Sequence, residues 1–165
     1  MMKYAIVAIV AAVASVATAR MLSALDTPAS PPPQAAVAVA EPAFSAASIS
    51  KAADGHYWAE ADVDGRDIHF LVDTGASAVA LTQDDARRLG IDPTMLDYKF
   101  GVVTANGQAR AAQVRLASIS VGGARVDNVE AYVLDRGLQT SLLGMTYLGR
   151  LSAFEATPQS LILRP

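Results

Sequence analysis

The segment "FLVDTGASAVALT", residues 70–82, is an apolar run that is interrupted by Asp73, Thr74 and Gly75. Asp-Thr-Gly occurs once in the chain, because the other Asp-Thr pair, Asp26-Thr27, runs into proline. A carboxylate at the end of an apolar strand is partly desolvated, a threonine hydroxyl can hydrogen-bond within the loop, and glycine permits a sharp turn. The pattern therefore predicts a carboxylate held in a fixed position at Asp73.

The residues before Asp73 read as a β-hairpin. Asp64-Gly65 is a two-residue turn signal, and apolar residues alternate with polar ones on both sides of it. The alternating positions are Tyr57, Ala59, Ala61 and Val63 before the turn and Ile68, Phe70 and Val72 after it. This hairpin would deliver Asp73 at a strand end.

The residues after the motif predict a short helix in "LTQDDARRLG". Thr82 is its N-cap, with Asp85 three residues later, Arg87 and Arg88 in the last turn, and Gly90 as the stop signal.

Further hairpins are predicted at Asn106-Gly107 and at Gly122-Gly123. The end of the chain, from Ser141, reads as a strand, a helical segment from about Met145 to Leu151, and two closing strands. The fold class is therefore mainly β with one or two short helices, in a small closed or partly closed barrel.

The composition limits the function classes. With 165 residues, 52% of them hydrophobic, the chain has room for one modest domain. A net charge of -3 gives no basic face for nucleic acid. The absence of cysteine excludes a disulfide framework, a thiol nucleophile and a thiolate metal site.

The N-terminus, residues 1–25, has two interpretations. Lys3 precedes sixteen uncharged, mostly apolar residues, and Arg20 follows them. Ala17-Thr18-Ala19 fits a signal-peptidase site, whereas an uncleaved membrane anchor would continue through "MLSAL". In both interpretations the rest of the chain is carried out of the cytoplasm, because the positively charged end stays inside.

A linker and a domain are predicted to follow. Residues 26–52 are rich in proline, alanine and serine, which is typical of a tether that cannot fold alone. The domain is predicted to span residues 53–165, where strand and turn signals dominate.

Candidate chemistry centres on Asp73. One carboxylate alone cannot both take a proton from water and give one to a leaving amine, but two facing carboxylates that share a proton can. Since the chain has one Asp-Thr-Gly, the second must come from another molecule. His56 and His69 form no metal-binding motif, and the hairpin register places His69 opposite Glu60 as an ordinary cross-strand pair. No cofactor and no metal are expected.

The motif resembles that of the retropepsin-type aspartic proteases. The resemblance rests on Leu71 to Ala76 and on Leu142-Leu143-Gly144 ahead of a short helix. The order of "LVDTGASAVALT", "TANG" and "LLGMTYLGRL" is similar to the bacterial single-domain, membrane-tethered members of this clan, and the similarity covers roughly Gly55 to Pro165. It implies a retropepsin-like half-barrel that is active as a homodimer.

The resemblance also implies roles for individual residues. Asp73 would be catalytic, and Thr74, Gly75 and Ala76 would form the active-site loop. Ala105, Asn106 and Gly107 would form a flap, and Leu142, Leu143 and Gly144 would support the active-site strand. The closing strand "SLILRP", residues 160–165, would lie in the dimer interface, because an unpaired apolar strand would otherwise be an exposed edge.

The expected function is an aspartic endopeptidase that acts on polypeptides, a regulatory protease of envelope or periplasmic proteins. The domain would lie in the periplasm, anchored by one pass in the bacterial inner membrane or released if the leader is cleaved. A different class of function stays open: a dimeric β module of the same fold that binds extended peptide without cutting it.

Overall fold

The computed structural model describes residues 45–165, so the predicted leader and residues 26–44 of the predicted linker lie outside the described residues. In chain order the elements are β1 (Ala47–Ser50), β2 (Trp58–Val63), β3 (Arg66–Val72), β4 (Val79–Leu81), α2 (Gln83–Arg88), the 3-10 helix η1 (Pro93–Met95), β5 (Phe100–Thr104), β6 (Gly107–Val121), β7 (Ala124–Leu134), β8 (Ser141–Leu143), α3 (Met145–Leu148), β9 (Ala153–Ala156) and β10 (Ser160–Arg164). The prediction of a mainly β domain with short helices is confirmed.

The hairpin that leads to Asp73 forms as predicted. β2 and β3 pair antiparallel, and Asp64 and Gly65 turn the chain with φ of 52° and 81°. The Asp64 carboxylate accepts a hydrogen bond from Ser118 N at 2.7 Å, which ties the turn to β6. The turn therefore positions β3 against the rest of the sheet as well as against β2.

The predicted helix is also present, as α2. The Thr82 hydroxyl accepts a hydrogen bond from Asp85 N at 3.1 Å, and Gly90 follows the helix with a φ of 83°. Because these signals act within a few residues, they could be identified from the sequence.

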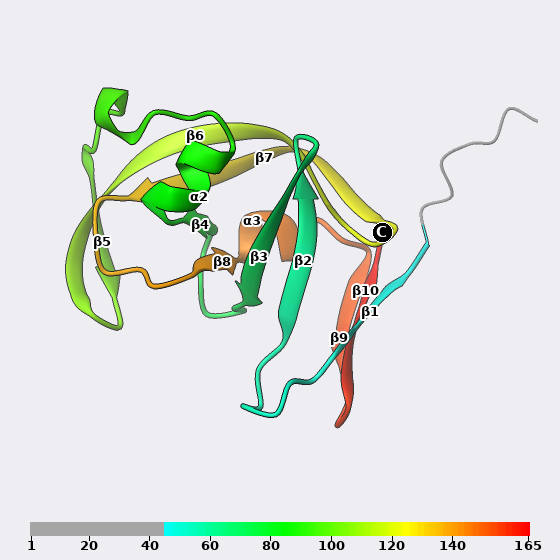
Figure 1. The fold of residues 1–165 in the computed structure, drawn as a ribbon. Coiled ribbons are helices and arrows are strands. Elements are labelled where there is room, and N and C mark those ends of the chain that lie inside the picture. The colour runs from blue at the N-terminus through cyan, green and yellow to red at the C-terminus, as the bar shows by residue number, and fades with distance from the viewer. Residues whose placement is uncertain (1–44) are drawn as a thin grey trace, which may run out of the picture. The chain divides into compact units, whose positions relative to one another are not determined.

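The larger sheet has seven strands in the order β2-β3-β8-β4-β7-β6-β5. Figure 1 shows the long β6 and β7 running across the domain, with α2 on one side of them. The predicted turns at Asn106-Gly107 and Gly122-Gly123 join β5 to β6 and β6 to β7. The strand β8, which is far from β3 and β4 in sequence, lies between them.

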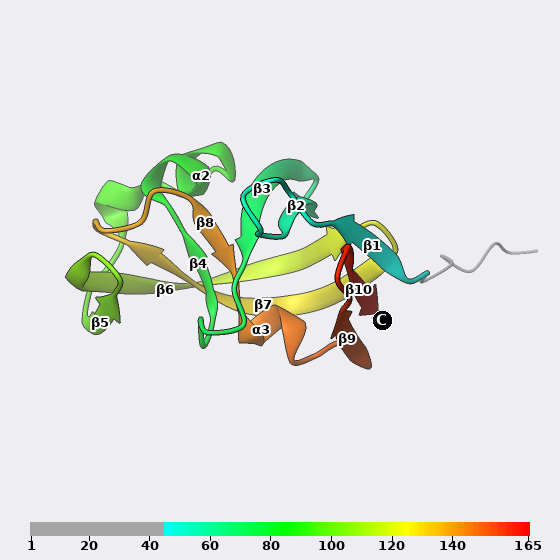
Figure 2. The ribbon, with the colours of Figure 1, turned by 90° about the horizontal axis from the view of Figure 1, so that it is seen from below.

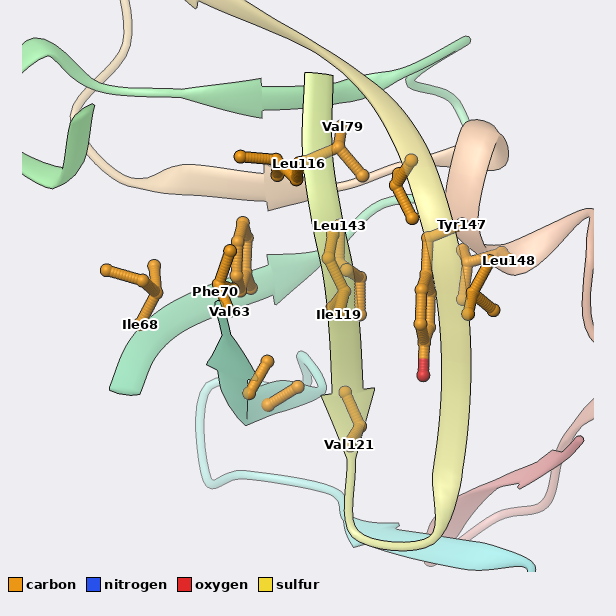
Figure 3. Close-up of a cluster of buried hydrophobic side chains, with 14 of the residues drawn as sticks. Val63, Ile68, Phe70, Val79, Leu116, Ile119, Val121, Leu143, Tyr147 and Leu148 are labelled. Atoms are coloured by element: carbon orange, nitrogen blue, oxygen red, sulfur yellow. The ribbon is translucent and has the colours of Figure 1, made fainter. Parts of the chain in front are cut away.

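The main core is formed by buried residues of this sheet, of α3 and of β1 and β10, and Figure 3 shows a cluster of buried hydrophobic side chains from it. Phe70 of β3 and Leu143 of β8 are fully buried in it, together with Tyr147 and Leu148 of α3. The Tyr147 hydroxyl donates to Ala124 O at 2.7 Å, so this buried polar group is satisfied. Burial raises the pKa of Tyr147, because the charged phenolate is poorly solvated there.

A smaller sheet has the order β1-β10-β9 and corrects two predictions. The closing strand is not an unpaired edge: β10 lies in the middle, and Leu161 and Leu163 are buried. The ordered fold also begins before residue 53, because β1 pairs with β10 within the range predicted as linker. Alanine and serine have weak strand propensity, so the alternation in β1 gave little signal.

The described residues contain no helix long and apolar enough to span a bilayer. The predicted anchor lies in residues 1–25, outside this part of the chain.

Candidate active site

Asp73 follows directly after β3, and hydrogen bonds with the backbone hold the loop that it begins in one conformation. The Asp73 carboxylate accepts a hydrogen bond from Gly75 N at 2.8 Å, and the Asp73 carbonyl accepts one from Ala76 N at 3.2 Å. Asp73 N donates to Leu143 O of β8 at 3.2 Å. The side chain and both main-chain polar groups of Asp73 are therefore restrained by neighbouring backbone.

The strand β8 supports the Asp73 loop by pairing with the two strands that the loop connects. It runs parallel to β3, with Val72 beside Leu143, and antiparallel to β4, with Ala80 beside Leu142. The chain thus passes down β3, turns through residues 73–78 and returns along β4, with β8 inserted between the two, which gives a ψ-shaped arrangement.

Gly144 allows the end of β8 and the Asp73 loop to approach each other closely. A Cβ atom at Gly144 would lie 2.2 Å from Ala78 O and 2.8 Å from Ala76 O. Directly after it, Met145 N donates to Ala76 O at 2.9 Å. The glycine of the second predicted motif is therefore required by close contact with the Asp73 loop.

Two polar side chains that were not singled out in the sequence complete the support. Thr146 Oγ accepts from Val79 N at 2.9 Å and donates to Glu130 O at 2.7 Å, which connects β4 to β7 through α3. Ser141, fully buried at the start of β8, donates to the Asp85 carboxylate at 2.6 Å and accepts from Thr82 N at 3.1 Å. No local pattern marks either residue, because their partners come from distant segments.

The site carries one carboxylate per chain. Between Leu71 and Leu81 and between Leu138 and Gly149, which together form the arrangement, Asp73 is the only acidic residue. Among residues 45–165, no group of three or more histidine, cysteine, aspartate or glutamate side chains could hold a metal ion.

The Asp73 loop lies at the surface of the single chain. Thr74 and Gly75 are exposed, Asp73 and Ala76 are half-buried, and no hydrogen bond of the Thr74 hydroxyl to another residue of 45–165 is found. Two cavities of about 220 and 530 Å³ in the described region are lined by other residues, so neither contains the Asp73 loop.

The hairpin predicted as a flap is present between β5 and β6. Thr104 Oγ donates to Gly107 O at 2.9 Å across the turn, and Asn106 Nδ2 donates to Gly137 O at 3.0 Å. The turn is therefore connected to the segment between β7 and β8. A role of Ala105, Asn106 and Gly107 in covering substrate stays a prediction.

His69 makes structural contacts, as predicted. It pairs with Glu60 at 2.6 Å, and its ring stacks on Trp58 with the ring centres 5.0 Å apart. These three side chains belong to the β2–β3 hairpin, on which they form one cluster.

Comparisons with known proteins agree with this architecture. The family described as "gag-polyprotein putative aspartyl protease" matches residues 59–150. A retropepsin-like aspartic protease from Rickettsia conorii is 40% identical, with a TM-score of 0.66, over 72% of this chain and 98% of that one. The EIAV protease, solved with the inhibitor HBY-793, shares the fold at 20% identity and a TM-score of 0.50, over 61% of this chain and 91% of that one.

Curated relatives are similar to the chain over part of their length. An uncharacterized protein of Sinorhizobium sp, encoded in the cobV 5' region, is 45% identical over 117 residues, which cover 70% of this chain and 50% of the relative. The chain spans about half the length of the curated relatives it matches. With a family match over more than half of its residues and a homologous structure matched almost in full, the chain belongs to the retropepsin-like aspartic protease family.

Proposed function

We propose that this chain is an aspartic endopeptidase whose active site is assembled from two copies, each of which supplies one Asp73. The observation that carries the proposal is the hydrogen-bonded loop with a single carboxylate at its start, next to β8 and Gly144. Membership of the retropepsin-like family supports a homodimer, in which a second Asp73 would complete the pair.

The mechanism follows from two carboxylates that share a site. Like charges in close proximity cannot both ionise comfortably, so the pair titrates as a unit and holds one proton. The ionised Asp73 takes a proton from a bound water, and the water oxygen attacks the peptide carbonyl carbon. The protonated Asp73 hydrogen-bonds the developing oxyanion, and a proton then passes to the leaving amine as the C–N bond breaks.

The neighbouring residues have supporting roles. Thr74, with its exposed hydroxyl, would brace the loops of the two copies against each other. A Cβ atom at Gly75 would lie 3.1 Å from Asp73 Oδ1, so a side chain there would press on the carboxylate and on any substrate above it. The β5–β6 turn at Ala105, Asn106 and Gly107 would close over the bound peptide and exclude water.

The setting we propose is the bacterial envelope. The N-terminal segment, as an anchor or a signal peptide, would export the domain, and the linker would hold it away from the membrane. Tethering raises the effective concentration of protomers, so the abundance of the chain would control its activity. The substrates would then be envelope or periplasmic polypeptides, cleaved in a regulatory step.

The experiment compares the 165-residue chain with its Asp73→Asn variant. The matched control is Asp67→Asn, since Asp67 is an exposed carboxylate on the solvent side of β3. Each protein is tested for dimer formation by sedimentation and incubated with an unfolded polypeptide from acid to neutral pH. We expect the chain and the control to cleave, and Asp73→Asn to dimerise without cleaving.

Two other results would contradict the proposed function, each in a different way. Cleavage that persists in Asp73→Asn would show that the site assignment is wrong. If all three proteins dimerise and bind extended peptides but none cleaves them, the chain is a peptide-binding module of this fold.

A further inference from the structure

The ladder between β2 and β3 continues past the ends of both strands, towards Asp73. Its register pairs Trp58 with Leu71, and one step further on Val72 N donates to Tyr57 O at 2.9 Å. Figure 2 shows β2 between β3 and β1, as Figure 1 does. The segment before β2 therefore runs beside the end of β3, where the Asp73 loop begins.

His56 is the next residue in this register, directly opposite Asp73. Its carbonyl accepts a hydrogen bond from Ala52 N at 2.8 Å, in the turn that follows β1, whereas the Tyr57 carbonyl points to β3. Carbonyl groups that alternate in this way belong to an extended strand, so the pairing reaches His56. Directly opposite side chains of an antiparallel pair lie on one face, with Cβ atoms about 4.5–5.5 Å apart. His56 and Asp73 therefore share one face of the sheet.

Two further aromatic rings lie on this face. Side chains alternate along a strand, so Trp58 is on the face of His56, and its partner Leu71 is on the face of Asp73. The Trp58 ring stacks on His69, with the ring centres 5.0 Å apart and 8° between the ring planes. We call the three rings of His56, Trp58 and His69 the aromatic row. The row thus begins opposite Asp73 and extends away from it along the hairpin.

Asp54 holds the aromatic row in place. Its carboxylate accepts one hydrogen bond from His56 N and one from Trp58 Nε1, both at 2.9 Å. The backbone bond from His56 is the largest cause that lowers the pKa of Asp54, and the bond from Trp58 adds to it, so this carboxylate is ionised at neutral pH. Because the rings are already held, a ligand that binds them pays for little ordering of side chains.

The surroundings of the aromatic row are acidic and accessible. Asp54 contacts the row through Trp58, and Glu60 contacts it through His69 at 2.6 Å; both carboxylates are exposed. Residues 52–65 and 67–86 contain no lysine or arginine that could neutralise them. Trp58 is half-buried, and with Glu60 it lines the cavity of about 530 Å³, so both residues border space that a ligand can enter. An aromatic surface flanked by carboxylates suits a flat cation, and the guanidinium of arginine stacks on aromatic faces.

We infer that the aromatic row binds an arginine side chain of the polypeptide substrate, next to the peptide bond that is held at Asp73. This rests on the proposed function and extends it to a class of substrate: polypeptides with arginine close to the bond that is cut. The guanidinium lies on the Trp58 ring, and Asp54 and Glu60 supply the opposite charge. Trp58 lies two positions along the ladder from Asp73, about 7 Å, so in an extended peptide the arginine is two or three residues from the cleaved bond.

Intrinsic fluorescence tests the contact directly, because Trp58 is the only tryptophan of the chain. The protein is the 165-residue chain with Asp73→Asn, so that cleavage does not consume the probe. The probes are two extended peptides in which alanine alternates with arginine or with citrulline, which has a similar shape and no charge. In either peptide every second side chain can reach the aromatic row. We expect the arginine peptide to change the Trp58 emission at a concentration about two- to fivefold lower than the citrulline peptide requires.

Mapping of cleavage sites tests the role in specificity. The parent chain and its Trp58→Leu and Trp58→Phe variants, each first checked for a native unfolding transition, digest the same unfolded polypeptide, and mass spectrometry identifies the residues around each cut. We expect the parent to favour arginine two or three residues from the cut, Trp58→Leu to lose this preference, and Trp58→Phe to keep it through its aromatic face. For an arginine peptide taken from a mapped site, Trp58→Leu should raise KM about two- to fivefold and leave kcat unchanged, because the contact is equally strong in the ground state and the transition state.

The outcomes distinguish failure of the arginine site from failure of the proposed function. Cleavage through Asp73 without a preference for arginine, or with a preference that Trp58→Leu retains, would overturn the arginine site and leave the proposed function intact. If the parent chain does not cleave, the proposed function fails and the fluorescence titration decides. A stronger response to the arginine peptide then keeps the aromatic row as a peptide-binding surface, and equal responses to the two peptides overturn it.

Discussion

Replacement of Gly144 by alanine tests how tightly β8 holds the Asp73 loop. A Cβ atom at this position would meet three backbone atoms: Ala78 O at 2.2 Å, Ala78 C at 2.6 Å and Ala76 O at 2.8 Å. Because none of the three belongs to a flexible side chain, the new methyl group can be accommodated only if the 73–78 loop or β8 moves.

The size of the effect follows from these distances. Ordinary van der Waals contact begins at 3.4 Å, so the Ala78 carbonyl must retreat by roughly 1 Å. Insertion of a methyl group into a well-packed site costs about 1–3 kcal/mol in the free energy of unfolding. A misplacement of about 1 Å at a reacting group lowers the rate by about 100-fold. We therefore expect Gly144→Ala to lose stability and also most of its activity.

The assay pairs urea denaturation with peptide cleavage and includes Gly101→Ala as the control. Gly101 lies in β5, and a Cβ atom there would have no neighbour within 4 Å. The control should keep the stability of the parent chain. If Gly144→Ala were as stable and as active as Gly101→Ala, the tight contact between β8 and the Asp73 loop would not control the site.

Three further predictions concern stability. Thr82→Ala removes the N-cap of α2 and should lower the free energy of unfolding by about 1 kcal/mol, measured in urea. The pKa of Tyr147 is raised on folding, so its stabilising contribution is complete below its unfolded pKa near 10.0. Above that pH the unfolded chain alone loses the proton, and stability should fall by about 1.4 kcal/mol per pH unit. Tyr147→Phe, although less stable at neutral pH, should show a shallower decline in alkaline urea titrations; an equally steep decline would contradict the assignment. Glu60→Gln should change the unfolding free energy by less than about 0.5 kcal/mol in the same urea assay, because the contact with His69 is exposed to solvent. A larger loss would contradict this assignment of a weak surface contact.

Local features of the fold could be predicted well from the sequence. The turn at Asp64-Gly65, the cap at Thr82 and the turn at Asn106-Gly107 each depend on a few adjacent residues, and each is present. Asp73 could be identified as a candidate for the same reason, because the motif is continuous in the chain. Its catalytic role stays a prediction until the Asp73→Asn comparison is made.

Other features had no local signal. Val79–Leu81 forms a strand of three residues between the loop and α2, which alternation cannot reveal at that length. Thr146 and Ser141 support the site through partners more than 15 residues away, at Glu130 and Asp85. The closing strand was expected at an edge, but β10 is central because β1 and β9 pair with it.

The turns, the helix cap and the position of a single carboxylate at a strand end follow from the order of the amino acids, because these features depend on backbone preferences and hydrogen bonds within a few residues. Three other features emerge only from the folded domain: β8 lies between β3 and β4, Gly144 touches the Asp73 loop, and β10 lies between β1 and β9. These features arise when strands distant in sequence pair to bury a common core, and that choice depends on the packing of the whole domain.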